Sequence, residues 1–218
     1  MSATAHYPVY LDLKKRSCVV IGGCGMAEEK VKGLLAAGAD VTVIASDLTP
    51  ALGAMARDGG ITWIDRGYRR GDLRLAFLAI VVGQPARVVD AAWEEGRERK
   101  VLVNTLDDVP HCTFIAPAVV QRGDLSIAIS TNGKAPVLAV RLRQLLEKLV
   151  GEEHARFLAL AGTVRAALAQ QWPDFGTRRE RWYRLVDSDV LDLLRRGDEP
   201  AAVGRFEEIL GVRPEAAP

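Results

Sequence analysis

The sequence predicts an α/β fold with a doubly wound parallel sheet, followed by a small β-hairpin region and a C-terminal helical domain. Three observations lead to this prediction. Short apolar runs alternate with amphipathic helical segments through the first half of the chain, which is typical of βαβ units. After residue 112, two apolar runs flank a short polar turn, which is a hairpin signal. From Ala135 onward, apolar residues recur at helical spacing.

The first elements form one βαβ unit. Residues Ser17–Ile21 are a short apolar run that ends in two glycines, as expected of a buried parallel strand. Residues 41–45 are a second such strand. A helix is predicted between them, ended by Gly38, because one of its faces is apolar, at Ala27, Val31, Leu34 and Leu35. The crossover between the two strands should be right-handed.

The remaining elements are predicted from periodicity and from helix- or strand-breaking residues. In the first half they are a short helix at 48–56, strands at 61–64 and 75–82, a helix at 85–98 and a strand that begins at 101–103. In the second half they are hairpin strands at 113–120 and 125–130, a helix from Ala135, and helices at 154–171, 178–195 and 201–210.

Composition excludes several classes of function. The net charge is +1 and no long basic tract predicts a nucleic-acid partner. No apolar run reaches the roughly 18 residues that suggest a membrane span, and the start of the chain lacks the apolar stretch of a secretory signal. The three cysteines, Cys18, Cys24 and Cys112, lack the spacing of metal ligands, and no metal site is predicted. Free thiols indicate a cytoplasmic protein.

A glycine-rich turn, residues 21–27 (IGGCGMA), separates the first strand from the first helix. Amide groups at a helix N-terminus bind phosphate oxygens, and glycines let the ligand approach the backbone. The turn is an imperfect match to the dinucleotide fingerprint G-x-G-x-x-A from Gly22, because Cys24 replaces the middle glycine, with Gly23 and Gly25 beside it. The alternative is a tight turn without a ligand. The flanking strand and amphipathic helix favour a Rossmann-like, nucleotide-binding domain.

Ser46 and Asp47 follow the second strand, where a Rossmann fold meets the adenosine ribose. A carboxylate at this place accepts a hydrogen bond from the 2′-hydroxyl and repels a 2′-phosphate. Asp47 therefore favours NAD over NADP as the cofactor. The alternative is that Asp47 only caps the helix that begins near Pro50.

An acidic pair, Asp107-Asp108, comes directly after the fifth predicted strand. Open α/β sheets bind ligands at the carboxyl ends of their strands, and a carboxylate there can act as a general base. The alternative is that both aspartates are turn or capping residues. His111 is interpreted as a loop residue, in preference to a role in proton transfer or a contact with a metal ion.

A resemblance to a known family rests on motifs spread over about residues 7–150. They are Gly22-Gly23 with Ala27 and Lys30, Val41-Thr42-Val43, Asn104 with Asp107-Asp108, Phe114-Ile115-x-Pro117-Ala118, and Ala128-Ile129-Ser130-Thr131-x-Gly133-x-x-Pro136-Val137-Leu138-Ala139. Together they resemble the precorrin-2 dehydrogenases, which are the N-terminal modules of sirohaem synthases and are related to the bifunctional dehydrogenase/ferrochelatase of yeast. The block from Asn104 to Ala139 is more specific than the glycine turn.

The resemblance implies a homodimeric enzyme that oxidises precorrin-2 to sirohydrochlorin with NAD⁺ in sirohaem and tetrapyrrole biosynthesis. The family's essential aspartate falls on Asp107, which is expected to act as the general base. Nucleotide contacts fall on Gly25-Met26 and Ser46-Asp47. The family's pocket serine falls on Ser130. Some members also insert Fe²⁺, so a second hypothesis is a bifunctional ferrochelatase with Fe²⁺ or Co²⁺ as substrate.

Precorrin-2 is a polycarboxylate, so its pocket should offer cations and backbone donors. The substrate-binding residues are expected to be Asn104, Ser130, Thr131, Asn132, Gly133, Lys134 and Arg141, with Arg122 and Arg143 as further local cations. A solvated helix face is the alternative for Arg141 and Arg143. The stripe of Leu138, Leu142, Leu145 and Leu149 is interpreted as a packing surface at the dimer interface.

The sequence departs from the family at Cys24, at Glu29 and at Val82-Gly83-Gln84, which puts cofactor affinity in doubt. The chain is expected to be a stand-alone dehydrogenase of three parts. These are a dinucleotide-binding domain at 1–112, a dimerisation and substrate region at 113–150, and a helical domain at 151–218. The alternative from another class is a non-catalytic NAD-sensing module, which would not need the acidic pair.

Overall fold

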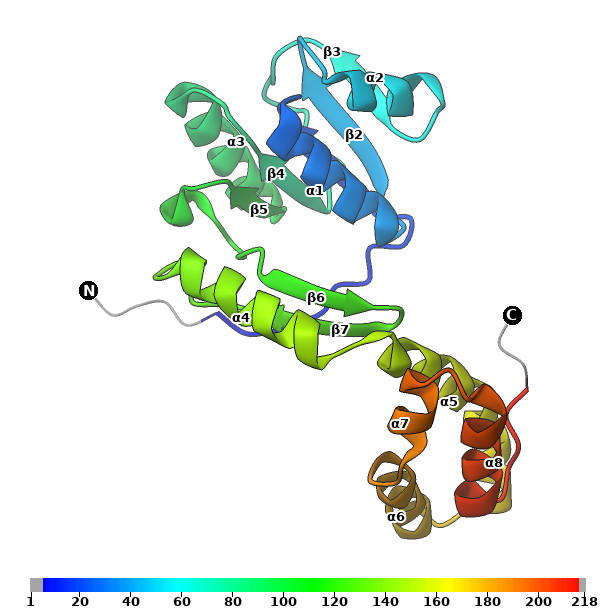
Figure 1. The fold of residues 1–218 in the computed structure, drawn as a ribbon. Helices are drawn as coiled ribbons and strands as arrows, with labels where there is room; N and C mark the ends of the chain where they lie inside the picture. The colour runs from blue at the N-terminus through cyan, green and yellow to red at the C-terminus, as the bar shows by residue number, and fades with distance from the viewer. Residues whose placement is uncertain (1–5, 216–218) are drawn as a thin grey trace. The chain divides into compact units, whose positions relative to one another are not determined.

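The computed structural model describes residues 6–215 and divides the chain into two compact units, Met1–Ala116 and Pro117–Pro218 (Figure 1). The hairpin and all the helices that follow it belong to the second unit. The division into three parts stays a prediction.

The first unit is built on a five-stranded parallel sheet in the order β3-β2-β1-β4-β5. Its elements are β1 (Ser17–Ile21), α1 (Gly25–Ala36), β2 (Asp40–Ala45), α2 (Pro50–Arg57), β3 (Thr62–Asp65), β4 (Leu78–Val81), α3 (Ala86–Arg99) and β5 (Leu102–Thr105). The chain first adds strands on one side of β1 and then on the other. This confirms the doubly wound sheet and puts a topological switch point between β1 and β4, where such sheets bind ligands.

The core of the first unit lies on both faces of this sheet, because side chains of a strand alternate between the faces. Cys18 and Val20 of β1 belong to the cluster that contains buried residues of α1 and α2. Val19 and Ile21 belong to the opposite cluster, which contains residues of α3. The strands are therefore buried on both sides, which is why they read as continuous apolar runs.

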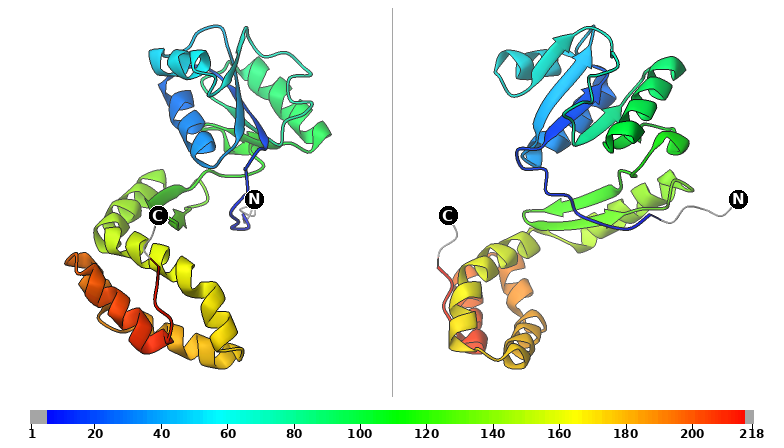
Figure 2. Two further views of the ribbon diagram at one scale, coloured as in Figure 1. Left: turned by 90° about the vertical axis from the view of Figure 1, so that its right-hand side faces the viewer. Right: turned by 180° about the vertical axis from the view of Figure 1, so that it is seen from behind.

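The second unit combines a hairpin with helices. The antiparallel strands β6 (Ala118–Arg122) and β7 (Leu125–Ile129) are covered by α4 (Pro136–Leu149), which runs along them in both views of Figure 2. A separate apolar core joins α5 (Glu152–Gln171), α6 (Phe175–Val186), α7 (Val190–Arg195) and α8 (Glu199–Leu210). The hairpin region and the helical C-terminal part were both predicted correctly.

The extents of three predicted elements were wrong. The strand predicted at 75–82 begins at Leu78, because residues 71–76 form turns. The hairpin strand predicted from residue 113 begins at Ala118, because the Thr113 hydroxyl is hydrogen-bonded to the backbone of Val103. The helix predicted at 178–195 is two helices. The Ser188 hydroxyl donates to the Leu185 carbonyl and accepts from the Val190 amide, which ends one helix before the next begins.

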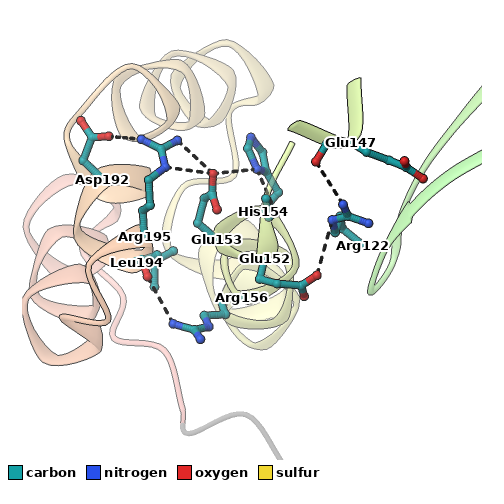
Figure 3. A network of polar contacts seen from close by, with 10 residues as sticks. Arg122, Glu147, Glu152, Glu153, His154, Arg156, Asp192, Leu194 and Arg195 are labelled. Atoms are coloured by element: carbon teal, nitrogen blue, oxygen red, sulfur yellow. Dashed lines mark hydrogen bonds and ion pairs between the residues drawn. The ribbon is translucent and has the colours of Figure 1, made fainter. Parts of the chain in front are cut away.

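A network of polar contacts fastens α5 to its neighbours (Figure 3). The buried Glu153 carboxylate accepts two hydrogen bonds from Arg195 of α7, at 2.9 and 3.2 Å. Burial alone would raise the pKa of Glu153. The hydrogen bond from its own backbone N–H and the charge of Arg195 outweigh burial, so the pKa lies below its usual value of 4.5. Arg122 reaches from the hairpin to the Glu147 carbonyl and to the carboxylate of Glu152.

We expect this ion pair between the buried Glu153 and the exposed Arg195 to make the second unit sensitive to acid. A carboxylate whose pKa is lowered by folding adds stability above its unfolded value, and this stability is lost as the pH falls through the folded value. The free energy of unfolding should therefore fall more steeply between about pH 5 and pH 3 in the native protein than in Glu153→Gln. Urea denaturation followed by circular dichroism measures both slopes, and equal slopes would contradict the prediction.

Candidate dinucleotide and catalytic site

The glycine turn is shaped by close backbone contacts. A Cβ at Gly22 would lie 2.3 Å from the Val82 carbonyl oxygen, and one at Gly23 would lie 1.9 Å from the Asp47 carbonyl oxygen. Gly22 also has a φ of +127°, which favours glycine. Gly25 differs, because a Cβ there would meet no atom within 4 Å. Two glycines thus serve the fold, and Gly25 leaves open space in front of the helix.

The N-terminus of α1 is suited to an anion. Cys24 is its N-cap residue and is exposed, but it makes no side-chain hydrogen bond to the first turn. The first amides of the helix therefore lack a side-chain cap, and the positive end of the helix dipole is exposed beside them. An uncapped helix next to open space at Gly25 fits the pyrophosphate of a dinucleotide.

A cavity of about 440 Å³ lies over the carboxyl ends of β1 and β2. Its lining contains four of the predicted cofactor residues: Gly22, Gly23, Ser46 and Asp47. The Asp47 side chain accepts a hydrogen bond from Ser46, at 3.3 Å. The capping alternative for Asp47 is wrong, because the N-cap of α2 is Thr49, whose hydroxyl accepts from the Leu52 amide.

A second cavity, of about 380 Å³, lies over the carboxyl ends of β4 and β5. It shares Gly83 and Gln84 with the first, so the two form neighbouring parts of one edge of the sheet. Met26 and Asp107 are among its lining residues. The structure thus brings a predicted cofactor residue and the predicted general base to one cavity, at the switch point of the fold.

Asp107 is presented at the tip of the turn that follows β5. Its φ is +61°, a left-handed conformation that is uncommon outside glycine. Its exposed side chain makes no hydrogen bond or ion pair with any residue from 6 to 215. The base of the turn is fastened by Cys112, whose thiol accepts from the Thr105 amide and donates to the Thr105 carbonyl, each at 3.2 Å.

Asn104 also fastens this turn. It is buried, and its side-chain amide donates to the Phe114 carbonyl at 3.0 Å. This hydrogen bond explains why a buried position within β5 carries an amide side chain. The expected role of Asn104 in substrate binding stays a prediction.

The second aspartate, Asp108, differs from its neighbour because it is paired. The His111 imidazole lies 2.8 Å from the Asp108 carboxylate through Nδ1 and 3.3 Å from the Asp90 carboxylate through Nε2. The ring also packs edge-on against Trp93, with 5.8 Å between the ring centroids. His111 is therefore a fixed side chain of the second cavity, which it lines.

The predicted substrate residues after Asn104 lie in the second unit. Ser130, Thr131, Asn132, Gly133 and Lys134 form the turn before α4, in which the Ser130 hydroxyl accepts from the Asn132 amide at 3.1 Å. Arg141 makes a hydrogen bond to Gln144. Arg143 is paired with Glu147, and Arg122 is bound to α4 and α5. No ion pair is seen within residues 6–215 for Lys134 or Arg141, which leaves these two cations for a ligand.

Several cavity residues escaped the sequence prediction. Asp90 of α3 lines the second cavity, and Trp93 of the same helix contacts His111. Both stand far from the acidic pair in the sequence, and only the fold places them beside His111. Thr105 also lines the second cavity, and its buried hydroxyl has no hydrogen-bond partner in the described part of the chain. Its place two residues before the acidic pair was the one feature of the sequence that could have pointed to Thr105.

Two further properties concern metals and membranes. Between residues 6 and 215, no group of three or more His, Cys, Asp or Glu side chains is placed to hold a metal ion. Over the same residues, no helix combines the length and the apolar character that a membrane span requires.

Three family models match the chain in sequence order. Residues 9–118 match a putative NAD(P)-binding family, residues 122–149 match the central region of sirohaem biosynthesis proteins, and residues 154–210 match the sirohaem synthase dimerisation region. The first match covers the parallel sheet and both cavities. The second and third cover most of the hairpin–helix unit.

Curated relatives of the chain include siroheme synthases. The chain is 36% identical over 197 residues to the siroheme synthase of Photobacterium profundum, covering 90% of this chain and 42% of the relative. It is 33% identical over 205 residues to siroheme synthase 1 of Serratia proteamaculans, covering 94% of this chain and 43% of the relative. The chain thus spans less than half the length of these relatives.

A solved structure shares the fold. SirC, a precorrin-2 dehydrogenase, superposes with a TM-score of 0.75 at 24% identity, covering 95% of this chain and all of that one. The α/β sheet, the hairpin and the helical region are therefore one known architecture. Because the NAD(P)-binding model spans half of the chain and two sirohaem-specific regions follow it in order, the chain belongs to this NAD(P)-binding family of sirohaem biosynthesis proteins.

Proposed function

We propose that the protein is an NAD-dependent precorrin-2 dehydrogenase, which oxidises precorrin-2 to sirohydrochlorin. The observation that carries this proposal is the Asp107 carboxylate, which has no partner among residues 6–215 and lies beside a dinucleotide-type cleft at the switch point of the sheet. The family models and the shared fold with SirC support it.

Oxidation of precorrin-2 requires one acceptor for a hydride and one for a proton. When bound, NAD⁺ accepts the hydride that the oxidation removes. Asp107 accepts the proton as general base, since its carboxylate makes no competing hydrogen bond or ion pair among residues 6–215. The uncapped N-terminus of α1, which begins at Gly25, holds the pyrophosphate, with Cys24 lining the first cavity and Met26 the second. Ser46 and Asp47 hold the adenosine ribose.

The preference for NAD over NADP is proposed to rest on Asp47. We expect Asp47→Asn to lower the ratio of kcat/KM for NAD⁺ to that for NADP⁺ by about 10-fold or more, because a hydrogen bond to a charged group is worth about 1.5–3 kcal/mol. Steady-state kinetics with both cofactors measure this ratio. Asp40→Asn is the matched control, since Asp40 is exposed at the opposite end of the same strand. An unchanged ratio in Asp47→Asn would contradict the assignment.

A homodimer is proposed from the second unit. The apolar stripe predicted on α4 is exposed in the single chain, with Leu138 52%, Leu142 38%, Leu145 53% and Leu149 63% accessible. A contiguous apolar surface of this kind marks an interface. The match of residues 154–210 to a dimerisation region supports the same conclusion.

We expect Leu145→Glu to convert the dimer to a monomer, because the interface would then bury an unpaired carboxylate. Light scattering coupled to size-exclusion chromatography gives the mass in solution. Leu75→Glu is the control, since Leu75 is 78% exposed and belongs to the other unit. A dimer that persists in Leu145→Glu would place the interface elsewhere.

The substrate's carboxylates are proposed to bind to the turn of Ser130, Thr131, Asn132 and Gly133, to Lys134 and Arg141, and to the Asn104 region.

Chelation of Fe²⁺ or Co²⁺ by the same protein is a further proposal, in which the metal is a substrate. The cytoplasm is the proposed location, supported by the free thiols of Cys18, Cys24 and Cys112. The boundaries at 112 and 150 are proposed as limits of the functional regions.

An anaerobic assay of the purified protein with precorrin-2 and NAD⁺ tests the proposal. Formation of sirohydrochlorin, followed by its absorbance and dependent on NAD⁺, is the expected result. Faster metal insertion after Fe²⁺ or Co²⁺ is added would establish chelation as well. NAD binding without turnover would overturn the dehydrogenase in favour of a sensing module.

A further inference from the structure

We propose that His111 is a positioning residue, which ties Asp108 to helix α3 and so leaves Asp107 as the free carboxylate of the acidic pair. The inference rests on the proposed function, since it assigns the base to Asp107. The resemblance assigns the base to Asp107, and the contacts of His111 give a physical reason why its neighbour Asp108 differs from it.

His111 lies between the turn and helix α3 and contacts both. We call the contacts of His111 with Asp108, Asp90 and Trp93 the clamp. Its Nδ1 lies 2.8 Å from Asp108, three residues earlier, and its Nε2 lies 3.3 Å from Asp90 on α3. Its ring meets Trp93, one helical turn from Asp90, at an interplanar angle of 84°. Nδ1 is in hydrogen-bond contact with Asp108, Nε2 lies within ion-pair distance of Asp90, and the ring edge contacts Trp93, so the ring bridges the turn and the helix.

The turn needs such a restraint. A non-glycine residue in the left-handed conformation costs on the order of 1–3 kcal/mol and persists only where its surroundings hold it. Cys112 and Asn104 fasten the base of the turn through Thr105 and Phe114. His111 fastens the tip, on the far side of Asp107. Without it, the Asp108 side chain is free to turn and the backbone at Asp107 can relax.

Charge gives the clamp a second effect. The second cavity is lined by three carboxylates, Asp90, Asp107 and Asp108, and by one imidazole between two of them. His111 engages the two carboxylates that are not assigned to catalysis. Among residues 6–215, Asp107 is then the one carboxylate of this cavity without a side-chain partner, whereas loss of the imidazole would leave all three unpaired in front of a polycarboxylate substrate.

Three variants test the clamp. His111→Ala removes both polar contacts and the ring contact. His111→Phe keeps a ring against Trp93 and removes only the polar contacts. We expect both to lower kcat for precorrin-2 oxidation on the order of 10–100-fold, as a misplaced catalytic group does. The dissociation constant for NAD⁺ should be unchanged, because Asp47 and the glycine turn are not touched. His111→Gln, which can still donate to one carboxylate, should recover part of kcat.

A double variant separates positioning from general stability. Asp108→Asn in the His111→Phe background removes the carboxylate that the imidazole had engaged. We expect it to recover the part of kcat that is lost to the unpaired negative charge, and not the part that is lost because the turn is no longer held. If His111 only stabilises the fold, the second substitution adds no recovery and the melting temperature falls in parallel with kcat. Additive losses in the double variant, or a normal kcat in His111→Phe, would overturn the proposal.

The crystal structure of His111→Phe gives a readout that does not depend on turnover. We expect Asp108 to leave α3 and Asp107 to lose its positive φ. An unchanged turn would overturn the clamp even if the enzyme is active. If the turn is displaced in His111→Phe but the native protein does not oxidise precorrin-2, the clamp is upheld and the proposed function is rejected.

Discussion

Asp107→Asn is expected to reduce the rate of precorrin-2 oxidation by about 10²–10⁴-fold, the usual contribution of a general base. Asparagine keeps the size and shape of the side chain but cannot accept the proton. Because Asp107 makes no hydrogen bond or ion pair with the described part of the chain, the substitution should not disturb the fold. Rapid-mixing kinetics under anaerobic conditions measure the loss, and isothermal titration calorimetry should show unchanged NAD⁺ affinity.

Asp108→Asn is the matched control, because it lies next to Asp107 but is engaged by His111. A hydrogen bond from the imidazole to the asparagine carbonyl can replace the one to the carboxylate, so the rate should change several-fold at most. If Asp108→Asn proves as inactive as Asp107→Asn, or if only Asp108→Asn is inactive, the base has been assigned to the wrong carboxylate.

Gly23→Ala is expected to abolish measurable NAD binding and to destabilise the first unit. The new Cβ would lie 1.9 Å from the Asp47 carbonyl oxygen, so β2 and the glycine turn must move apart. Overpacking of this kind costs about 1–3 kcal/mol or more, because backbone cannot rotate away as a side chain can. The movement also displaces Asp47 from the ribose position.

Gly25→Ala is the contrasting variant, because its Cβ would meet no protein atom within 4 Å. Its melting temperature should equal that of the native protein, and its NAD⁺ affinity should fall if the pyrophosphate lies against this residue. Thermal denaturation with and without NAD⁺ distinguishes the two variants. A Gly23→Ala protein with native stability would show that the turn yields more easily than the contact distance indicates.

The fold was largely predictable from the sequence because its signals are local. Buried parallel strands appear as apolar runs, and α1 shows its buried face as a stripe of Ala27, Val31 and Leu34. The glycine turn and Asp47 were found for the same reason, since the ribose position lies at a known distance from the turn. Element ends were less predictable, because side-chain hydrogen bonds such as those of Thr113 and Ser188 decide them.

The arrangement around the acidic pair was not predictable, because it depends on tertiary contacts. His111 reads as a loop residue in the sequence, and its partners Asp90 and Trp93 belong to a helix before β5. Nothing in the sequence around Asp107 and Asp108 tells which carboxylate is free. Only the approach of α3 to the turn makes the two aspartates different.

The strand order of the sheet has a consequence for how the chain folds. The central strand β1 pairs with β4, so that Cys18 must pair with Leu78, far along the chain, before the five-stranded sheet can form. The hairpin and the helix that covers it join residues close in sequence. Folding rates fall as contacts become less local. During refolding, the amides of the second unit should therefore become protected from hydrogen exchange first. The nucleotide cleft should form later, because it depends on slow pairing of the parallel strands.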